Sequence, residues 1–263
     1  MQEVWKDIDT HAKQWIREAG EQLMASLKKT LIIETKSNAA DLVTNMDRET
    51  EQFLIGEIKE TFPAHNILGE EGYGDGITSS NGVVWLIDPI DGTMNFVHQK
   101  RNFAISIGIY ENGIGKIGLI YDPVHDELYH AVKGEGAFCN DLAIPMLEKG
   151  TVEHGVIALN AIWLTDNPLL NMEKMMMLVK KARGTRSYGC AALEMVYVAT
   201  GRLDAYVTPR LSPWDFGGGQ IIVEEVGGKV TTFLGTPLSI VEKSSVLVAK
   251  PGVYEELLPF VSQ

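Results

Sequence analysis

Val83-Val84-Trp85-Leu86-Ile87-Asp88-Pro89-Ile90-Asp91-Gly92-Thr93 is the stretch from which most of the fold and chemistry of this chain can be argued. Its five apolar residues, 83–87, include several β-branched side chains and predict a buried strand. Asp88 is then expected to leave the sheet at its carboxyl end, and Asp91 follows one tight turn later. The sequence therefore predicts two neighbouring carboxylates.

Two carboxylates this close require a cation, a shared proton or solvating water. Pro89 and Gly92 suit a tight bend, and Thr93 is expected to cap a following helix whose free N–H groups would attract an anion. The segment could therefore hold a metal ion and a phosphate group side by side. The alternative is that Asp-Pro-Ile-Asp-Gly is ordinary turn chemistry without a ligand.

Composition favours a globular protein with a substantial core, since 45% of the 263 residues are hydrophobic. No run approaches the ~18 uncharged apolar residues of a membrane span, and the first residues lack the pattern of a signal peptide. Cys139 and Cys190 lie far apart in the sequence, which argues against a disulfide framework. We therefore expect a cytoplasmic protein with no membrane partner.

The charge balance disfavours a nucleic-acid partner, because 35 acidic residues face 23 basic ones and the formal net charge is −12. An anionic small molecule could still bind if divalent cations first reversed the local potential. The acidic balance is therefore compatible with a metal-dependent phosphate site.

The periodicity predicts one layered α/β domain over 1–263, with an α+β part, 1–143, and an α/β part, 144–263. The first part should hold helices over 4–29 and 45–61, strands over 66–69 and 83–87, and an antiparallel meander over 103–110, 115–121, 127–133 and 137–140. The second should hold strands near 156–159, 204–207 and 229–232, and helices near 169–181, 190–200, 215–226 and the end of the chain.

Further carboxylates lie at ends of predicted elements, and each has an ordinary structural explanation. Glu70 follows a short apolar strand within a polar loop, Asp215 could cap a helix, and Asp47 suits the first turn of a helix capped by Thr44. Their joint occurrence with the Asp88 pair favours a site for a hard cation. Magnesium is the natural candidate, because the six histidines show no ligand spacing.

These motifs together resemble the inositol monophosphatase family of Mg²⁺-dependent, lithium-sensitive phosphatases. The resemblance covers nearly the whole chain. It is carried by Lys36 with Asp41-Leu42-Val43-Thr44-Asn45-Met46-Asp47, by Gly69-Glu70-Glu71, by Asp88 to Thr93 with Asn95-Phe96, by Gly134-Glu135-Gly136-Ala137-Phe138, by Gly189-Cys190-Ala191-Ala192 and by Trp214-Asp215.

The resemblance implies an alternating αβαβα sandwich of the sugar phosphatase type, and hydrolysis of a phosphate monoester by water without a phosphoenzyme. Two or three Mg²⁺ ions per site are expected. The implied metal ligands are Glu70, Asp88, the Ile90 carbonyl, Asp91 and Asp215. Glu70 and Thr93 would position and deprotonate the water, and Asp47 would help to hold a weaker ion.

The resemblance also implies the contacts to substrate, which would come from Asp91, Gly92, Thr93, Gly189, Cys190, Ala191 and Thr208, with Lys36 neutralising the carboxylate cluster. Two positions depart from the family pattern. Thr208 stands where many members have a glutamate that binds inositol hydroxyls, and Cys190 stands where Ser or Thr is usual. The change at Thr208 puts strict inositol specificity in doubt. Arg210 could favour a second anionic group, or be a solvated surface residue.

We therefore expect a homodimeric phosphatase that acts on small phosphate monoesters, with inositol monophosphate as the first substrate. A shifted activity on fructose 1,6-bisphosphate, NADP(H) or 3′-phosphoadenosine nucleotides is the alternative within the family. A non-catalytic binding protein on the same scaffold is the alternative of another class. The complete set of carboxylates favours an enzyme, because a protein freed from catalysis need not keep every ligand.

Overall fold

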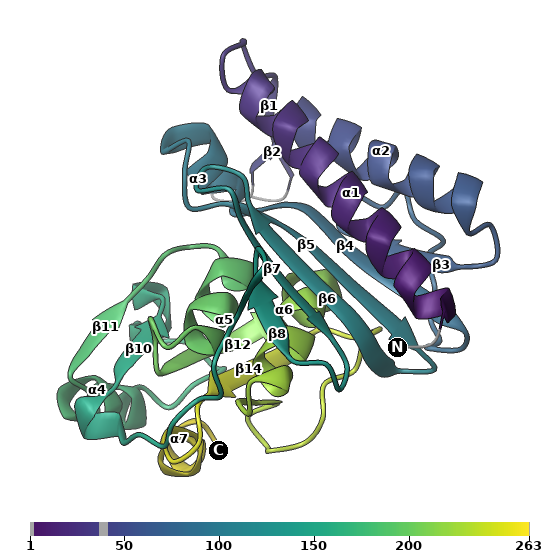
Figure 1. The fold of residues 1–263 in the computed structure, drawn as a ribbon. Coiled ribbons are helices and arrows are strands. Elements are labelled where there is room, and N and C mark those ends of the chain that lie inside the picture. Colours follow the sequence, from purple (N-terminus) through teal and green to yellow (C-terminus); the bar gives the residue numbers. More distant parts are fainter. Residues whose placement is uncertain (1–2, 37–41, 263) are drawn as a thin grey trace.

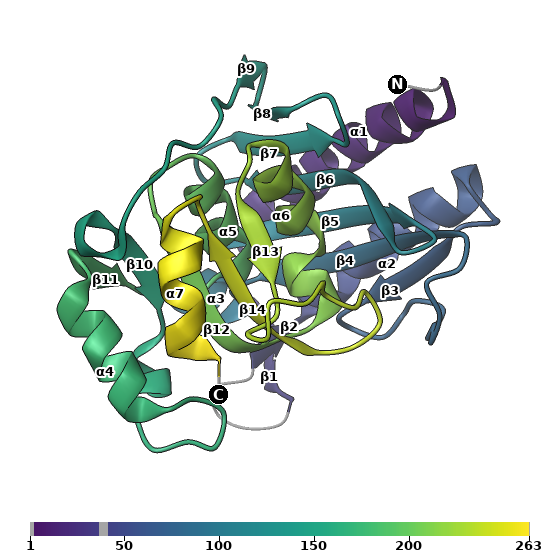
Figure 2. The same ribbon diagram turned by 90° about the horizontal axis from the view of Figure 1, so that it is seen from below.

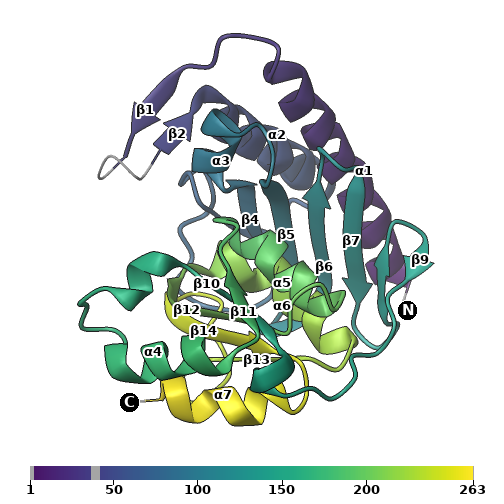
Figure 3. The ribbon, with the colours of Figure 1, turned by 90° about the vertical axis from the view of Figure 1, so that its left-hand side faces the viewer.

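The computed structural model describes residues 3–36 and 42–262, so Asp41 of the 41–47 motif lies outside the described residues. Helices and sheets alternate in five layers (Figures 1 and 3). The predicted αβαβα sandwich is therefore confirmed. The helices are α1 (Glu3–Ser26), α2 (Asn45–Thr61), α3 (Thr93–His98), α4 (Met172–Lys181), α5 (Ala191–Ala199), α6 (Pro213–Glu225) and α7 (Val253–Val261), with 3₁₀ turns η1 (Val152–His154) and η2 (Ala161–Leu164).

The larger sheet has the order β3-β4-β5-β6-β7-β8-β9. Its strands are β3 (Asn66–Gly69), β4 (Val83–Asp91), β5 (Ala104–Glu111), β6 (Ile114–Asp122), β7 (Glu127–Val132), β8 (Ala137–Cys139) and β9 (Leu142–Ala143). Only β3 and β4 pair in parallel, with Gly69 opposite Ile87, and the others form the predicted antiparallel meander. The parallel pair brings Glu70 and Asp88 to the same end of the sheet.

Helices cover both faces of this sheet (Figure 1). One face packs against α1 and α2, because α1 turns a buried stripe that includes Trp5, Ile8 and Trp15 toward the strands. The other face packs against α5 and α6. Residues 84–87 of β4 are fully buried, as expected of a strand covered on both faces.

The smaller sheet has the order β11-β10-β12-β14-β13 and closes the second half of the sandwich (Figure 2). Its strands are β10 (Val156–Leu159), β11 (Gly184–Arg186), β12 (Ala205–Leu211), β13 (Lys229–Thr231) and β14 (Ser244–Ala249), and α4 and α7 lie on its outer face. Sequence periodicity missed β11 and β14, and it also missed the hairpin of β1 (Ile33–Thr35) and β2 (Leu42–Thr44). Helix α4 begins three residues later than predicted, because Asn171 caps it by accepting a hydrogen bond from the Lys174 amide.

Two local predictions about the opening stretch are wrong. Asp88 does not leave the sheet, because β4 continues to Asp91 through an irregularity in which Asp88 pairs with Ser106 and Asp91 with Ala104. One extra residue on β4 makes this a bulge, which is where a strand tolerates Pro89. Thr93 is not the cap of α3, because Gly92 occupies that position with a φ of 88°. Thr93 is thereby left to use its hydroxyl inside the site.

Among the described residues, no helix combines the length and the apolar character needed to cross a membrane.

Candidate active site

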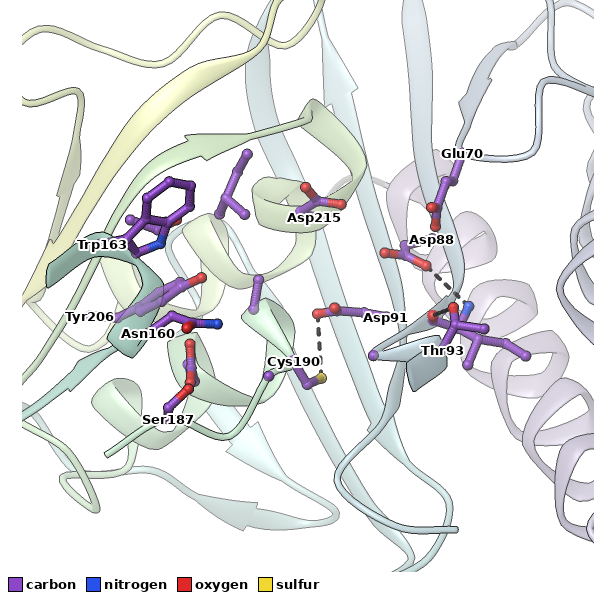
Figure 4. A pocket seen from close by; sticks show the side chains of 17 residues that line it. Glu70, Asp88, Asp91, Thr93, Asn160, Trp163, Ser187, Cys190, Tyr206 and Asp215 are labelled. Carbon is purple, nitrogen blue, oxygen red and sulfur yellow. Dashed lines mark hydrogen bonds between the residues drawn. The ribbon is translucent and has the colours of Figure 1, made fainter. Parts of the chain in front are cut away.

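A cavity of about 280 Å³ opens where β3, β4, β10 and β11 end and where α5 and α6 begin. All predicted site residues except Asp47 and Lys36 line it. The lining residues are Glu70, Asp88, Ile90, Asp91, Gly92, Thr93, Asn160, Trp163, Ser187, Gly189, Cys190, Ala191, Glu194, Tyr206, Thr208, Leu211 and Asp215. The sandwich therefore gathers residues from both halves of the sequence into one site (Figure 4).

Four carboxylates approach the cavity from three directions (Figure 4). Glu70 follows β3, and its amide still donates to the Ile87 carbonyl at 3.2 Å. Asp88 and Asp91 lie on either side of the bulge in β4. Asp215 is in the first turn of α6, where one carboxylate oxygen accepts the Ser212 amide at 2.7 Å. The alternative prediction that Asp215 is the N-cap is wrong, because Ser212 is the N-cap of α6 and Asp215 is the N3 residue of its capping box. This bond occupies only one of the two Asp215 oxygens.

Burial and mutual repulsion act on these carboxylates together. Burial raises the pKa of Asp88 well above its usual range, and the charges of Glu70, Asp91 and Asp215 raise it further. Burial and the Asp91 charge likewise raise the pKa of Asp215. Burial raises the pKa of Asp91, although its hydrogen bonds to α5 and Cys190 oppose the effect. The site therefore brings together several carboxylates whose charge the surrounding protein compensates only in part.

Lys36 is the cation that contacts the rim of this cluster. Its ammonium group lies 3.1 Å from Glu70 Oε1 and also contacts Glu71 Oε1. Burial lowers the pKa of Lys36, but the two glutamates outweigh it and leave the pKa raised. Burial raises the pKa of Glu71 to about 7 despite this ion pair. Lys36 therefore stays charged and offsets part of the repulsion at Glu70.

Asp47 reaches the site through Thr93. The Thr93 hydroxyl donates toward Asp47 Oδ1 at 2.9 Å and lies 3.0 Å from the Ile90 carbonyl. The other oxygen of Asp47 accepts the Thr44 amide and hydroxyl, each at 2.7 Å. Asp47 is completely buried and burial raises its pKa, which the hydrogen bonds of Thr44 and Thr93 oppose. Asp47 thus joins the start of α2 to the start of α3.

The cavity wall opposite β4 is formed by the start of α5. Asp91 Oδ2 accepts the Ala192 amide at 2.5 Å and lies 3.3 Å from Cys190 Sγ (Figure 4). Gly189 has a φ of 71°, which brings the backbone of 189–191 to the cavity without a side chain in the way. Burial raises the pKa of the Cys190 thiol well above its usual range, so this thiol is an inert packing group.

The donor set of the cavity fits a divalent cation of the hard class. It offers carboxylates and the Ile90 carbonyl, and the neighbouring carboxylates repel one another. Among residues 3–36 and 42–262, no three His, Cys, Asp or Glu side chains already form a group that could hold a metal ion.

Sequence reasoning missed one wall of the cavity, which consists of Asn160, Trp163, Ser187, Glu194, Tyr206 and Leu211. Asn160 is the first residue after β10, and Ser187 is the first residue after β11. Glu70 was predicted as a site residue because it has the same position after β3. For Asn160 that signal was present in the sequence, because a strand was predicted near 156–159, whereas no strand was predicted before Ser187. Trp163 carried no such signal, because it lies in the 3₁₀ turn η2. Tyr206 lies two residues before Thr208 on β12, so strand alternation places both on the same face of the smaller sheet. Thr208 lies buried in the same wall.

Proteins named as inositol monophosphatases are similar to this chain over nearly its whole length. The chain is 57% identical over 253 residues to the inositol-1-monophosphatase of Bacillus subtilis (strain 168), which covers 96% of each chain. SaIMPase-II with bound inositol monophosphate superimposes with a TM-score of 0.88 at 42% identity, covering 97% of this chain and 93% of that one. SaIMPase-II with bound 2′-AMP gives a TM-score of 0.87 at 45% identity, covering 95% and 92%.

The layered fold and the carboxylate-lined cavity, together with these relatives, define a phosphoric monoester hydrolase that depends on divalent metal. A sequence model of the inositol monophosphatase family matches residues 5–262. The chain belongs to that family, and the resemblance seen in its motifs is confirmed.

Proposed function

We propose that this protein hydrolyses small phosphate monoesters in a Mg²⁺-dependent reaction, and that inositol monophosphate is its first substrate. The observation that carries the proposal is the gathering of Glu70, Asp88, Asp91 and Asp215 around one cavity, with the Thr93 hydroxyl beside them. The relatives that share the fold support the choice of substrate.

Two or three Mg²⁺ ions would be held by Glu70, Asp88, the Ile90 carbonyl, Asp91 and Asp215. When bound, such ions neutralise phosphate charge and lower the pKa of a coordinated water. The repulsion among the carboxylates supports this assignment, because a cation would relieve it. Lys36 limits the repulsion on one side through its contact with Glu70.

Glu70, Thr93 and Asp47 would handle the attacking water. The Thr93 hydroxyl is already oriented by Asp47 and by the Ile90 carbonyl, so its lone pairs can accept a hydrogen bond from water in the cavity. Glu70 faces the same space and can take up the proton. Water would then attack phosphorus directly as the bond between phosphorus and the ester oxygen breaks, and the departing alkoxide would take a proton from solvent water. No covalent phosphoenzyme would form.

The phosphate and the alcohol would occupy different parts of the cavity. The amides of Gly92 and Thr93 would donate to phosphate oxygens, with Asp91 beside them. Gly189, Cys190, Ala191 and Thr208 would contact the alcohol. Thr208 offers one hydroxyl where many family members have a carboxylate, which weakens discrimination among alcohols.

A nucleoside 2′-phosphate is a second candidate substrate. The half-buried indole of Trp163 lines the same side of the cavity as Asn160 and Ser187, and these groups suit a planar base with hydrogen-bonding edges (Figure 4). SaIMPase-II has been solved with 2′-AMP bound. Replacing Trp163 with Ala should raise the KM for 2′-AMP more than that for inositol monophosphate.

The test is phosphate release from a panel of monoesters, measured with and without Mg²⁺ and Li⁺. The panel contains inositol monophosphate, 2′-AMP, fructose 1,6-bisphosphate, NADP and a 3′-phosphoadenosine nucleotide. Fastest Mg²⁺-dependent release from inositol monophosphate, inhibited by Li⁺, is expected. Inactivity on every substrate would instead favour a non-catalytic binding protein.

We also propose a homodimer, one domain spanning 1–263 with parts 1–143 and 144–263, and a cytoplasmic location. The exposed side chains of Met172, Met176 and Met177 on α4 support a contact between copies. Light scattering after gel filtration should give twice the mass of the 29.0 kDa chain. A monomer at micromolar concentration would contradict the dimer.

A further inference from the structure

The loop 69–74, which carries Glu70, is anchored by a buried glutamate of α2. Glu51 Oε2 accepts the Glu71 amide at 2.7 Å, and Glu51 Oε1 accepts the Tyr73 amide at 3.0 Å. Glu51 is completely buried. Both oxygens of one carboxylate are therefore committed to the backbone immediately after Glu70.

Gly69 shows how closely the loop is seated on Glu51. A Cβ atom placed on Gly69 would lie 2.6 Å from the carboxyl carbon of Glu51 and 2.7 Å from each of its oxygens. Such a contact is too short for any side chain, so a Cβ at Gly69 would force the Glu51 carboxylate out of its place. Its φ is negative, unlike that of Gly72, so alanine is conformationally allowed there.

The loop that carries Glu70 has few backbone bonds of its own to the larger sheet. After Gly69 the chain no longer belongs to β3, and the Glu70 amide keeps one sheet-like bond to Ile87. The Glu51 carboxylate adds two charge-assisted hydrogen bonds that oppose displacement of the loop.

Helix α2 connects this anchor to the opposite side of the proposed water site. Asp47 and Glu51 are one helical turn apart and both are fully buried. Asp47 bonds to the Thr93 hydroxyl, whereas Glu51 bonds to the loop that carries Glu70. One rigid helix thus fixes the two groups proposed to hold the water relative to each other.

We propose that Glu51 is a positioning residue that holds Glu70 at the distance from Thr93 and Asp88 required for cation binding and water attack. This inference rests on the proposed function, because Glu51 would act through the role proposed for Glu70. Glu51 itself does not line the cavity, so it contacts neither substrate nor water there.

Glu51→Gln tests the proposal with little change in shape. An amide can accept with one oxygen, but its NH₂ group must then face a backbone N–H donor, so the loop loses one bond and gains a repulsive contact. We expect kcat to fall roughly 10- to 100-fold and the Mg²⁺ concentration for half-maximal activity to rise about tenfold. The KM for inositol monophosphate should change by less than about twofold, because the contacts to the ester are untouched.

Two further measurements separate positioning from general loss of structure. Amide hydrogen exchange of the metal-free protein should quicken at 69–74 and stay unchanged in β4, and calorimetric titration should show weaker Mg²⁺ binding. Glu49→Gln is the matched control, since Glu49 is exposed on α2 and accepts only a side-chain hydrogen bond from Asn45 in the described structure. Unchanged exchange and unchanged Mg²⁺ affinity in Glu51→Gln would overturn the proposal.

A double-mutant cycle keeps the proposal testable if Glu51→Gln folds poorly. Gly69→Ala should lower kcat and Mg²⁺ affinity in the wild-type background, because its Cβ collides with Glu51. In the Glu51→Ala background the same substitution should cause no further loss of kcat or of Mg²⁺ affinity. Equal losses in both backgrounds would overturn the proposal. If the wild-type protein shows no Mg²⁺-dependent phosphatase activity, the proposed function is refuted instead. The hydrogen-exchange measurement would still decide whether Glu51 anchors the loop.

Discussion

Replacing Glu194 with Gln should flatten the dependence of stability on pH. Glu194 lies on α5, where its Oε1 accepts the Tyr188 amide at 2.6 Å and so holds the loop before Gly189. The side chain is 5% exposed. Burial raises its pKa from the ordinary 4.5 to about 7, and the charge of Asp91 adds to this, although the amides of Tyr188 and Gly189 oppose it.

The sign and size of the effect follow from proton linkage. Between pH 4.5 and about 7 the folded protein holds a proton on Glu194 that the unfolded chain has released. The contribution of protonated Glu194 to the free energy of unfolding is therefore complete below pH 4.5 and is lost as the pH rises through 7. At about 1.36 kcal/mol per pKa unit, the loss amounts to roughly 3 kcal/mol. Glutamine does not titrate, so the variant lacks this loss.

The assay is urea unfolding of both metal-free proteins at several pH values from 4.5 to 8. The free energy of unfolding of the wild type should fall across this range by roughly 3 kcal/mol more than that of Glu194→Gln. Other carboxylates titrate in both proteins, so the difference between the two curves isolates Glu194. Parallel curves would refute the assignment of a raised pKa to this buried group.

Three further outcomes are expected at the site. Thr93→Val should lower kcat about 10²- to 10⁴-fold at saturating Mg²⁺, with Thr93→Ser retaining most activity; equal rates for Val and wild type would rule out a role for the hydroxyl. Thr208→Glu should increase the preference for inositol monophosphate over 2′-AMP about tenfold. An unchanged ratio of the two kcat/KM values would show that residue 208 does not determine this preference. Mg²⁺ at 100 times its Kd should stabilise the wild type by about 2.7 kcal/mol, which raises its Tm. The same Mg²⁺ concentration should stabilise Asp88→Asn much less. Equal Tm shifts in the two proteins would show that Asp88 is not a metal ligand.

The sequence predicted those parts of the fold that depend on local periodicity. Residues 83–87 form a doubly covered strand, and α1 and α2 lie close to their predicted ranges. The small strand β11 was missed because its stability comes from pairing with β10 rather than from a local pattern. The hairpin β1–β2 was missed for the same reason. The strand β14 was missed although its apolar run 246–249 carries the same kind of signal as residues 83–87.

The acidic side of the site was predictable because its residues share one position, the end of a strand or the start of a helix. Glu51 and Glu194 escaped notice because a glutamate inside a helix usually faces solvent. Their burial depends on which face packs against a loop, and this is a tertiary property. The bulge at Pro89 was taken for a turn, because the register of β4 against β5 is set by the partner strand.

Phosphate release from inositol monophosphate, measured against Mg²⁺ concentration for the wild type and for Asp88→Asn, tests the central claim most directly. We predict release by the wild type that disappears when divalent cations are chelated, and a rate at least about 10³-fold lower in Asp88→Asn with unchanged circular dichroism. Release that persists without divalent cations, or that is equal in the two proteins, would contradict the claim that these carboxylates form a metal-dependent phosphatase site.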